Sequence, residues 1–337
     1  MNGAMQVAQR GTSTSLVHDG TISNFSPDRF QFQLNNTLDE LEGTLAQVTD
    51  SPDGFSNSLK WTTTEPEGAI DADHYVSLFQ KIEGQNLQHI KNGSSGALSL
   101  TLSFYVKSSQ TGTFGVNLYK DDSTSRIINS TYTIASANTW EYKTITFAGD
   151  TSGGGINNDN GIGFYCSWHL AAGSNFDSVN STSWANYSTT NWAGGHAQDG
   201  VITTDNATWQ ITGIQLEVGS NASDFEHRSF GEELSLCQRY YEEVGSGVGR
   251  AVSASQAELI MTYQVPKRAA GTITLNNGTG GITEMLRSQS NITSINGAFV
   301  ATTKYHAQRM TSSDTGMNNG SMVVLMKEDA IAVDSEL

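Results

Sequence analysis

The sequence is poor in charged residues, and basic residues are the scarcest. Charged side chains make up 15% of its 337 residues, against about 25% in an average soluble protein. The first 244 residues contain 11 Lys and Arg but 27 Asp and Glu, whereas residues 245–337 contain 7 of each. Binding to a phosphate backbone needs Lys and Arg to displace counterions. The composition therefore argues against nucleic acid as a partner.

Cysteines and long apolar runs are also scarce. Cys166 and Cys237 allow one pair at most, which is too little to indicate an oxidising compartment, so buried free thiols are the simpler interpretation. No apolar run reaches the length of a membrane span. The opening MNGAMQVAQRGTS lacks the basic start and apolar core of a signal peptide. We therefore expect synthesis in a cytoplasm and no insertion into a membrane.

Gly, Ser, Thr and Asn are abundant instead, as is typical of an extracellular β-protein with many turns. Two segments alternate clearly with a period of two, which predicts strands with one buried face. Residues 98–107 place Leu, Phe and Val on one side and Ser, Thr, Tyr and Lys on the other. Residues 162–170 direct Cys166 and Trp168 inward and leave Tyr165, Ser167 and His169 outward. About eight such segments predict a β-sandwich.

Two of these segments change phase. In residues 140–147 the apolar positions shift by one, from Trp140 and Tyr142 to Ile145 and Phe147. In residues 208–218 a similar shift surrounds Gly213. One extra residue in a strand produces such a shift, so we predict a β-bulge in each segment.

The stretch 208–243 contains the most specific motif of the chain. It reads TWQITGIQLEVGS, then FEHRS, then LCQRYYEE. Ser229 and Glu232 have the spacing of a capping box and predict a helix, which Gly245 and the glycines that follow would end.

This stretch, together with the SPDRFQF segment near the N-terminus, resembles structural proteins of tailed bacteriophages. In those proteins it closes a carbohydrate-binding-module-like jelly roll in tail fibres and related appendages. The resemblance implies an all-β fold in three parts. These are a jelly-roll β-sandwich (residues 1–228), a short connecting helix with a Gly-rich linker (229–249), and a smaller C-terminal β-sandwich domain (250–337).

The resemblance also implies a function. The chain is expected to be a non-enzymatic virion protein, a tail-fibre or appendage subunit that presents a receptor- or glycan-binding surface to the host. Other virion proteins and two further copies in a homotrimer would be its partners. Related chains often begin with a virion-anchoring segment, whereas this one begins at the jelly-roll opening, so attachment would use another part or a partner protein. Two alternatives stay open: a head or neck decoration protein without a ligand, and a polysaccharide-degrading appendage.

The connection 171–206 has no clear strand pattern, and it is the candidate ligand site because long loops in compact domains are usually functional or disordered. Sugars present apolar C–H faces and hydroxyl groups, so their sites pair exposed aromatic rings with short polar side chains. The connection supplies such rings, and the outward row of the preceding strand adjoins them. Alternatively, the rings fold back as a small core of the loop. The candidate glycan-binding residues are Trp184, Tyr187, Trp192, Tyr165 and His169.

Cofactor and catalytic motifs are weak. The resemblance implies a structural calcium ion, for which Asp71, Asp73 and Glu217 are candidate ligands, but no EF-hand pattern is present and solvated turn acids are the favoured alternative. The seven His residues are scattered singly, and no G-x-S-x-G or H-E-x-x-H motif occurs. We therefore predict no catalytic site.

Overall fold

The computed structural model divides the chain into two compact units, an N-terminal domain (residues 1–230) and a C-terminal domain (residues 231–336). No helix in the described part of the chain is long and apolar enough to cross a membrane. The structure describes residues 1–336 apart from residues 19–21, 24–26, 36–37, 276–291 and 313–321.

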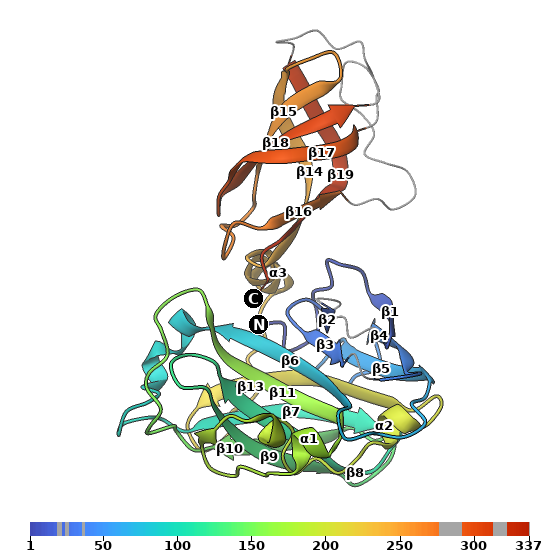
Figure 1. Cartoon of the computed structure of the whole chain (residues 1–337), viewed down its shortest axis with the longest axis vertical. Coiled ribbons are helices and arrows are strands. Elements are labelled where there is room, and N and C mark those ends of the chain that lie inside the picture. Colours follow the sequence, from blue (N-terminus) through green and yellow to red (C-terminus); the bar gives the residue numbers. More distant parts are fainter. Residues whose placement is uncertain (19–21, 24–26, 36–37, 276–291, 313–321, 337) are drawn as a thin grey trace. The chain divides into compact units, whose positions relative to one another are not determined.

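The N-terminal domain is a sandwich of two antiparallel sheets (Figure 1). The six-stranded sheet has the order β1 (Ser13–Val17), β4 (Glu42–Val48), β5 (Ser58–Glu65), β13 (Thr208–Val218), β7 (Leu100–Ser108) and β10 (Glu141–Phe147). The seven-stranded sheet has the order β12 (Ala185–Asn186), β9 (Arg126–Ile134), β8 (Gly112–Lys120), β11 (Ile162–Ala172), β6 (Tyr75–Glu83), β3 (Gln31–Leu34) and β2 (Ile22–Ser23). The predicted all-β class and jelly-roll sandwich are confirmed.

The core lies between the two sheets and follows the predicted alternation. Leu102, Phe104 and Val106 of β7 are fully buried, whereas Leu98, which was predicted on the same face, precedes the strand and is 37% exposed. Across the sandwich, the ring of Phe104 meets that of Trp168 edge-on at 5.8 Å. Large rings supply most of the buried apolar area in such a core. Cys166 and Cys237 are both buried and free, as predicted.

Only one of the two predicted bulges is present. β13 changes register against β7 between Thr212 and Gln215, which confirms a bulge at Gly213. In contrast, β10 pairs with β7 in unbroken register from Glu141 to Phe147, so the bulge predicted there is wrong. The apparent phase change arises because Tyr142 faces outward, 48% exposed, while Phe147 faces the core. Apolar residues lie on both faces of a regular strand.

Residues 173–207, called here the long connection, join β11 to β13. They contain four short elements: α1 (Ser174–Asp177), β12, η2 (Thr189–Asn191) and α2 (Gly200–Thr203). Two backbone hydrogen bonds join the long connection to β9 and the residue before that strand. The N–H of Asn129 donates to the Ser181 carbonyl, and the N–H of Tyr187 donates to the Ser125 carbonyl. The long connection is therefore an ordered layer over one part of the seven-stranded sheet. A further short element, η1 (Gly84–Ile90), follows β6.

The predicted helix, α3 (Phe230–Gln238), is present, and all of its residues after Phe230 belong to the C-terminal domain. The described strands of this domain form one antiparallel sheet around a small core that includes Leu259, Met261 and Ile331. The strand order is β16 (Thr272–Leu275), β19 (Met322–Asp334), β14 (Tyr241–Ala251), β15 (Gln256–Thr262), β18 (Tyr305–Ser312) and β17 (Ile292–Ala301).

The Gly-rich segment after α3 is a strand, which corrects the linker predicted up to residue 249. Gly245, Gly247 and Gly249 all lie in β14, between β15 and β19. The sheet itself gives a reason for glycine here. A Cβ atom on Gly249 would lie 1.7 Å from the carbonyl oxygen of Glu258 in the neighbouring strand. Glycine permits this close approach of two backbones.

Candidate functional site

The outer face of the seven-stranded sheet has a row of aromatic rings across three neighbouring strands. Tyr165 in β11 pairs with Tyr119 in β8, and their ring centroids lie 5.3 Å apart. On the other side, the ring of Phe79 in β6 lies 5.7 Å from that of Tyr165. These side chains share a face because alternate residues of a strand point to opposite sides. The other side of each strand faces the core.

The long connection adds two more rings to this row. The ring of Tyr187 lies 4.8 Å from that of Tyr119, and the ring of Trp192 lies 5.8 Å from it. A capping box between Ser188 and Asn191 fixes the turn of η2 between the two rings. The aromatic patch is defined as Phe79, Tyr119, Tyr165, Tyr187 and Trp192. Phe79 is buried and the other four rings are half-buried, so they keep part of their surface in solvent.

Two charged side chains, Lys81 and Asp121, lie beside the aromatic patch. The Lys81 ammonium lies 5.8 Å from the centroid of the Phe79 ring and 5.5 Å from that of Tyr165, which is cation–π geometry. The Tyr119 hydroxyl donates a hydrogen bond to Asp121 over 2.7 Å. Burial and the charge of Asp121 raise the pKa of Tyr165 to about 12, so this phenol is neutral at pH 7.

Beneath the patch lies a buried polar layer centred on His169. The side-chain amide of Asn117 donates to the Trp192 carbonyl and to His169 Nε2, the latter over 3.0 Å. His169 Nδ1 therefore has the proton and donates to the Ser77 hydroxyl over 2.8 Å. Burial, reinforced by the nearby His196, holds the pKa of His169 well below its usual value. The layer ties the carbonyl of Trp192 to the sheet and so positions the Trp192 ring.

The structure brings together three of the five predicted glycan residues, Tyr165, Tyr187 and Trp192. The sequence correctly predicted that His169 lies on the outer face of the sheet. The prediction that its side chain is exposed there is wrong, because the side chain is 0% exposed. The long connection covers it, and the Trp192 ring packs edge-on against the imidazole at 5.5 Å. His169 therefore supports the patch from below and cannot contact a ligand directly.

Trp184 lies apart from the aromatic patch. Its ring stacks on the core residue Phe164 with a centroid distance of 5.8 Å, and its indole N–H donates to the Ala148 carbonyl over 2.6 Å. For this ring the alternative interpretation, a side chain folded back onto the protein, is the one that the structure supports. The sequence prediction also omitted Tyr119 and Phe79. Both residues occupy outward-facing positions of strands with a period of two, so the alternation of the sequence could have predicted that they lie on the outer face.

The predicted calcium ligands do not form a group. Asp71 and Asp73 are exposed in the loop before β6. Glu217 is in β13, where its carboxylate accepts hydrogen bonds from the Ser223 hydroxyl at 2.6 Å and from the side chain of Gln215 at 3.1 Å. These contacts give Glu217 a structural role in the turn after β13.

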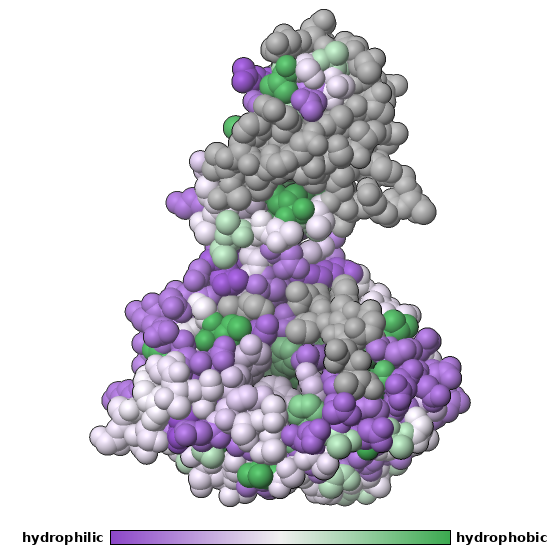
Figure 2. All heavy atoms as spheres, in the orientation of Figure 1, coloured by the Kyte–Doolittle hydropathy of each residue, from purple (hydrophilic) through white to green (hydrophobic). Residues whose placement is uncertain are grey.

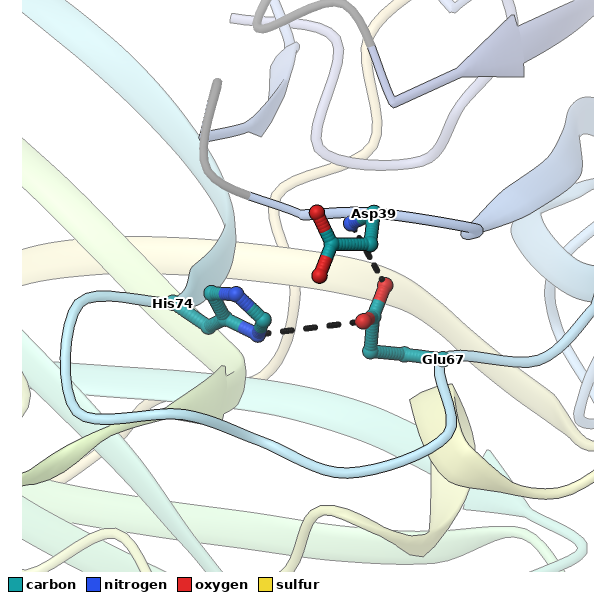
Figure 3. A group of neighbouring side chains, drawn as sticks. All are labelled: Asp39, Glu67 and His74. Carbon is teal, nitrogen blue, oxygen red and sulfur yellow. Dashed lines mark hydrogen bonds and ion pairs between the residues drawn. The ribbon is translucent and has the colours of Figure 1, made fainter.

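One cluster of potential ligands occurs in the described part of the chain, at Asp39, Glu67 and His74 (Figure 3). Glu67 Oε2 already accepts the backbone N–H groups of residues 39–41 at 3.2–3.3 Å, and His74 Nδ1 accepts the N–H of Asp71. Calcium requires six to eight oxygen ligands. The cluster does not fit calcium. Glu67 instead holds the loop of residues 39–41 in place.

No family model and no curated protein matches the chain. Among solved structures it is similar to tailspike protein 4 of bacteriophage CBA120, with 12% identity over 65% of this chain and a TM-score of 0.33. The chain spans only 21% of the length of the solved chain, which is the enzymatically active domain of that tailspike. It is also similar to the family 11 carbohydrate-binding module from Clostridium thermocellum, with 11% identity over 64% of this chain and 98% of the module, and a TM-score of 0.31. At such TM-scores the similarities carry no conclusion about ligands or assembly.

Proposed function

We propose that the N-terminal domain binds carbohydrate through the aromatic patch and that the chain is a non-enzymatic subunit of a phage tail fibre or related appendage. The observation that carries the binding proposal is the contiguous set of four half-buried rings around Tyr119. Such rings offer apolar faces to the C–H groups of a sugar. Tyr and Trp also have a polar group that stays hydrated at a partly wet surface.

The surroundings of the rings favour a sugar over an apolar ligand. Figure 2 shows that the visible surface of the N-terminal domain is mostly hydrophilic or intermediate, with only scattered hydrophobic residues. Apolar docking surfaces on proteins are usually large contiguous patches. The patch instead combines rings with the Tyr119 phenol, the Asp121 carboxylate and the Lys81 ammonium, which are groups that bond to hydroxyls.

The virion role in this proposal rests on the sequence resemblance of residues 208–243 to phage appendage proteins. On that basis the partners are other virion proteins, two further copies of the chain and a host surface glycan. An acidic N-terminal domain is consistent with a glycan as ligand, since it disfavours phosphate backbones.

Host surface polysaccharides printed on a glycan array test the proposal. We expect the full chain to bind at least one of them, and Tyr119→Ala combined with Tyr165→Ala to remove the signal. Tyr305→Ala, at a 41% exposed tyrosine of the C-terminal domain, is the matched control and keeps the signal. Binding that survives the double substitution would place the site elsewhere. No binding at all favours a decoration protein, and new reducing ends in the polysaccharide indicate an enzyme.

A further inference from the structure

The opposite face of the N-terminal domain has a second aromatic depression. It has a volume of about 610 Å³ and lies on the outer side of β7, β10 and β13, between two loops. Small-molecule pockets usually occupy about 300–1,000 Å³. We call this depression the second groove, and its aromatic lining consists of Phe55, Tyr105, Tyr142, Phe225 and His227.

The rings of the second groove are in mutual contact. Phe55 is central, with ring centroids 5.5 Å from Tyr105, 5.0 Å from Phe225 and 5.2 Å from His227. Tyr105 in turn lies 4.9 Å from Tyr142. Tyr142 and His227 are exposed, and the other three are half-buried. The rings therefore form a continuous surface that is open to solvent.

The bulge at Gly213 makes this arrangement possible. Gly213 has φ +64°, and a Cβ atom there would lie 2.8 Å from Cζ of Phe55 and 3.1 Å from Cδ2 of Tyr105. Without a side chain, the backbone leaves room for the Phe55 ring to lie over the sheet.

The loop after β13, which contains residues 220–227, forms one wall of the second groove and is fixed to β13 by hydrogen bonds. The Glu217 carboxylate accepts from the Ser223 hydroxyl, and the side chain of Gln215 donates to the Asp224 carbonyl at 3.3 Å and accepts the Glu226 N–H at 2.8 Å. Preformed walls lower the entropy lost when a ligand binds. Glu217, a candidate metal ligand by sequence, thus shapes the second groove.

The polar lining of the second groove specifies the class of ligand. Hydroxyls of Ser103 and Thr144 lie at the sheet, and Asp53 and Asp224 lie in the loops. No Lys or Arg is among the described residues that line it. We propose that the second groove binds a carbohydrate residue without an acidic group, either a neutral or an amino sugar. The rings provide stacking, the hydroxyls donate or accept hydrogen bonds, and the carboxylates accept hydrogen bonds and disfavour an anion.

The second groove and the aromatic patch differ in charge. No Lys or Arg is among the described residues that line the groove, whereas the Lys81 ammonium lies over two rings of the patch. The inference goes beyond the proposed function, because it does not require the patch to bind anything. Two sites on opposite sheets of one domain would let a single copy engage two glycan segments at once, which raises avidity.

Chemical-shift mapping of the full-length chain tests the inference. The probes are cellohexaose, maltohexaose, xylohexaose and the glucosamine hexamer, with a galacturonic acid hexamer as the acidic comparison. We expect at least one neutral or amino probe to shift amides of β7, β10 and residues 220–227 at millimolar concentration, and the acidic hexamer to leave them unchanged. Tyr142→Ala should weaken that binding about tenfold, the loss of one well-packed aromatic contact.

Phe55→Ala is the second variant, and Tyr305→Ala is the control outside both sites. Absence of shifts at the second groove with all neutral and amino probes would overturn the inference, as would unchanged affinity in both groove variants. If Tyr142→Ala alters the oligomeric state by light scattering instead, the face is an interface between copies and the sugar assignment is wrong. Shifts at the second groove but not at the aromatic patch would leave this inference standing while the proposed function fails.

Discussion

The Tyr119 and Tyr187 rings lie 4.8 Å apart at an interplanar angle of 55°, one from a strand and the other from the long connection. Their contact joins the two parts of the aromatic patch. We predict that Tyr119→Ala and Tyr187→Ala each weaken glycan binding about tenfold, or about 1.4 kcal/mol. Because the rings touch, the double variant should lose less than the sum of the two effects. Calorimetric titration of the four proteins with an array-identified glycan measures this coupling.

The same titration on Tyr305→Ala, outside the N-terminal domain, should reproduce the wild-type affinity. Strict additivity of Tyr119→Ala and Tyr187→Ala would mean that the two rings contact the ligand independently, which contradicts a shared stacking surface.

Asp150 is the buried anion of a small charge network. Its carboxylate accepts from Arg126 Nε at 2.9 and 3.1 Å and lies 3.9 Å from the ammonium of the fully buried Lys120. Removing one partner of a buried ion pair leaves uncompensated charge. We predict that Asp150→Ala lowers the free energy of unfolding of the N-terminal domain by about 3–5 kcal/mol. Urea titration followed by tryptophan fluorescence measures the loss.

Asp205→Ala is the matched control, since Asp205 is exposed and should change the unfolding free energy by no more than about 0.5 kcal/mol. A loss below about 1 kcal/mol for Asp150→Ala would mean that water reaches the two cations and solvates them.

His169 predicts a pH dependence of stability. Its pKa in the folded protein is held well below the usual value, chiefly by burial, while the unfolded chain has a pKa near ~6.5. Between the two values the unfolded state binds more protons, so stability rises with pH there. The contribution is complete above about pH 6.5 and falls by about 1.4 kcal/mol per pH unit on acidification, until the folded pKa is reached.

Urea midpoints at pH 5.5 and 7.5 test this dependence. His169→Gln is expected to be less stable at both values but to have a flatter pH profile than the wild type. The comparison between the two proteins isolates the contribution of His169. Identical slopes would show that His169 takes up its proton as easily in the folded protein as in the unfolded chain.

Strand periodicity was enough to predict the core. The alternation in β7 and β11 correctly assigned Phe104, Val106 and Trp168 to the interior, because side chains of period two must separate onto two faces. The same alternation predicted that Tyr165 and His169 share the outer face. It did not predict which of them is covered. That depends on where the long connection lies, and only tertiary contacts determine its path.

The error at β10 has a similar origin. Trp140 and Tyr142 were assigned to the core side because they are aromatic, and the sequence then required a bulge. In the structure Tyr142 is on the outer face, where it contributes to the second groove. An aromatic residue at an outward position of a regular strand can therefore belong to a surface site. Hydrophobicity alone does not distinguish such a residue from one in the core.

Gly213→Ala tests the link between the bulge and the second groove. The position has φ +64°, which costs an alanine about 1–2 kcal/mol, and the new Cβ would also meet the rings of Phe55 and Tyr105. We predict a loss of stability of about 2–5 kcal/mol, since overpacking adds about 1–3 kcal/mol to the backbone strain. Gly11→Ala separates the two effects, because Gly11 also has positive φ but nothing lies within 4 Å of its Cβ position. Amide shifts of residues 53–55 and 220–227 should change in Gly213→Ala only. Equal losses in both variants, without those shifts, would mean that the rings do not depend on the glycine.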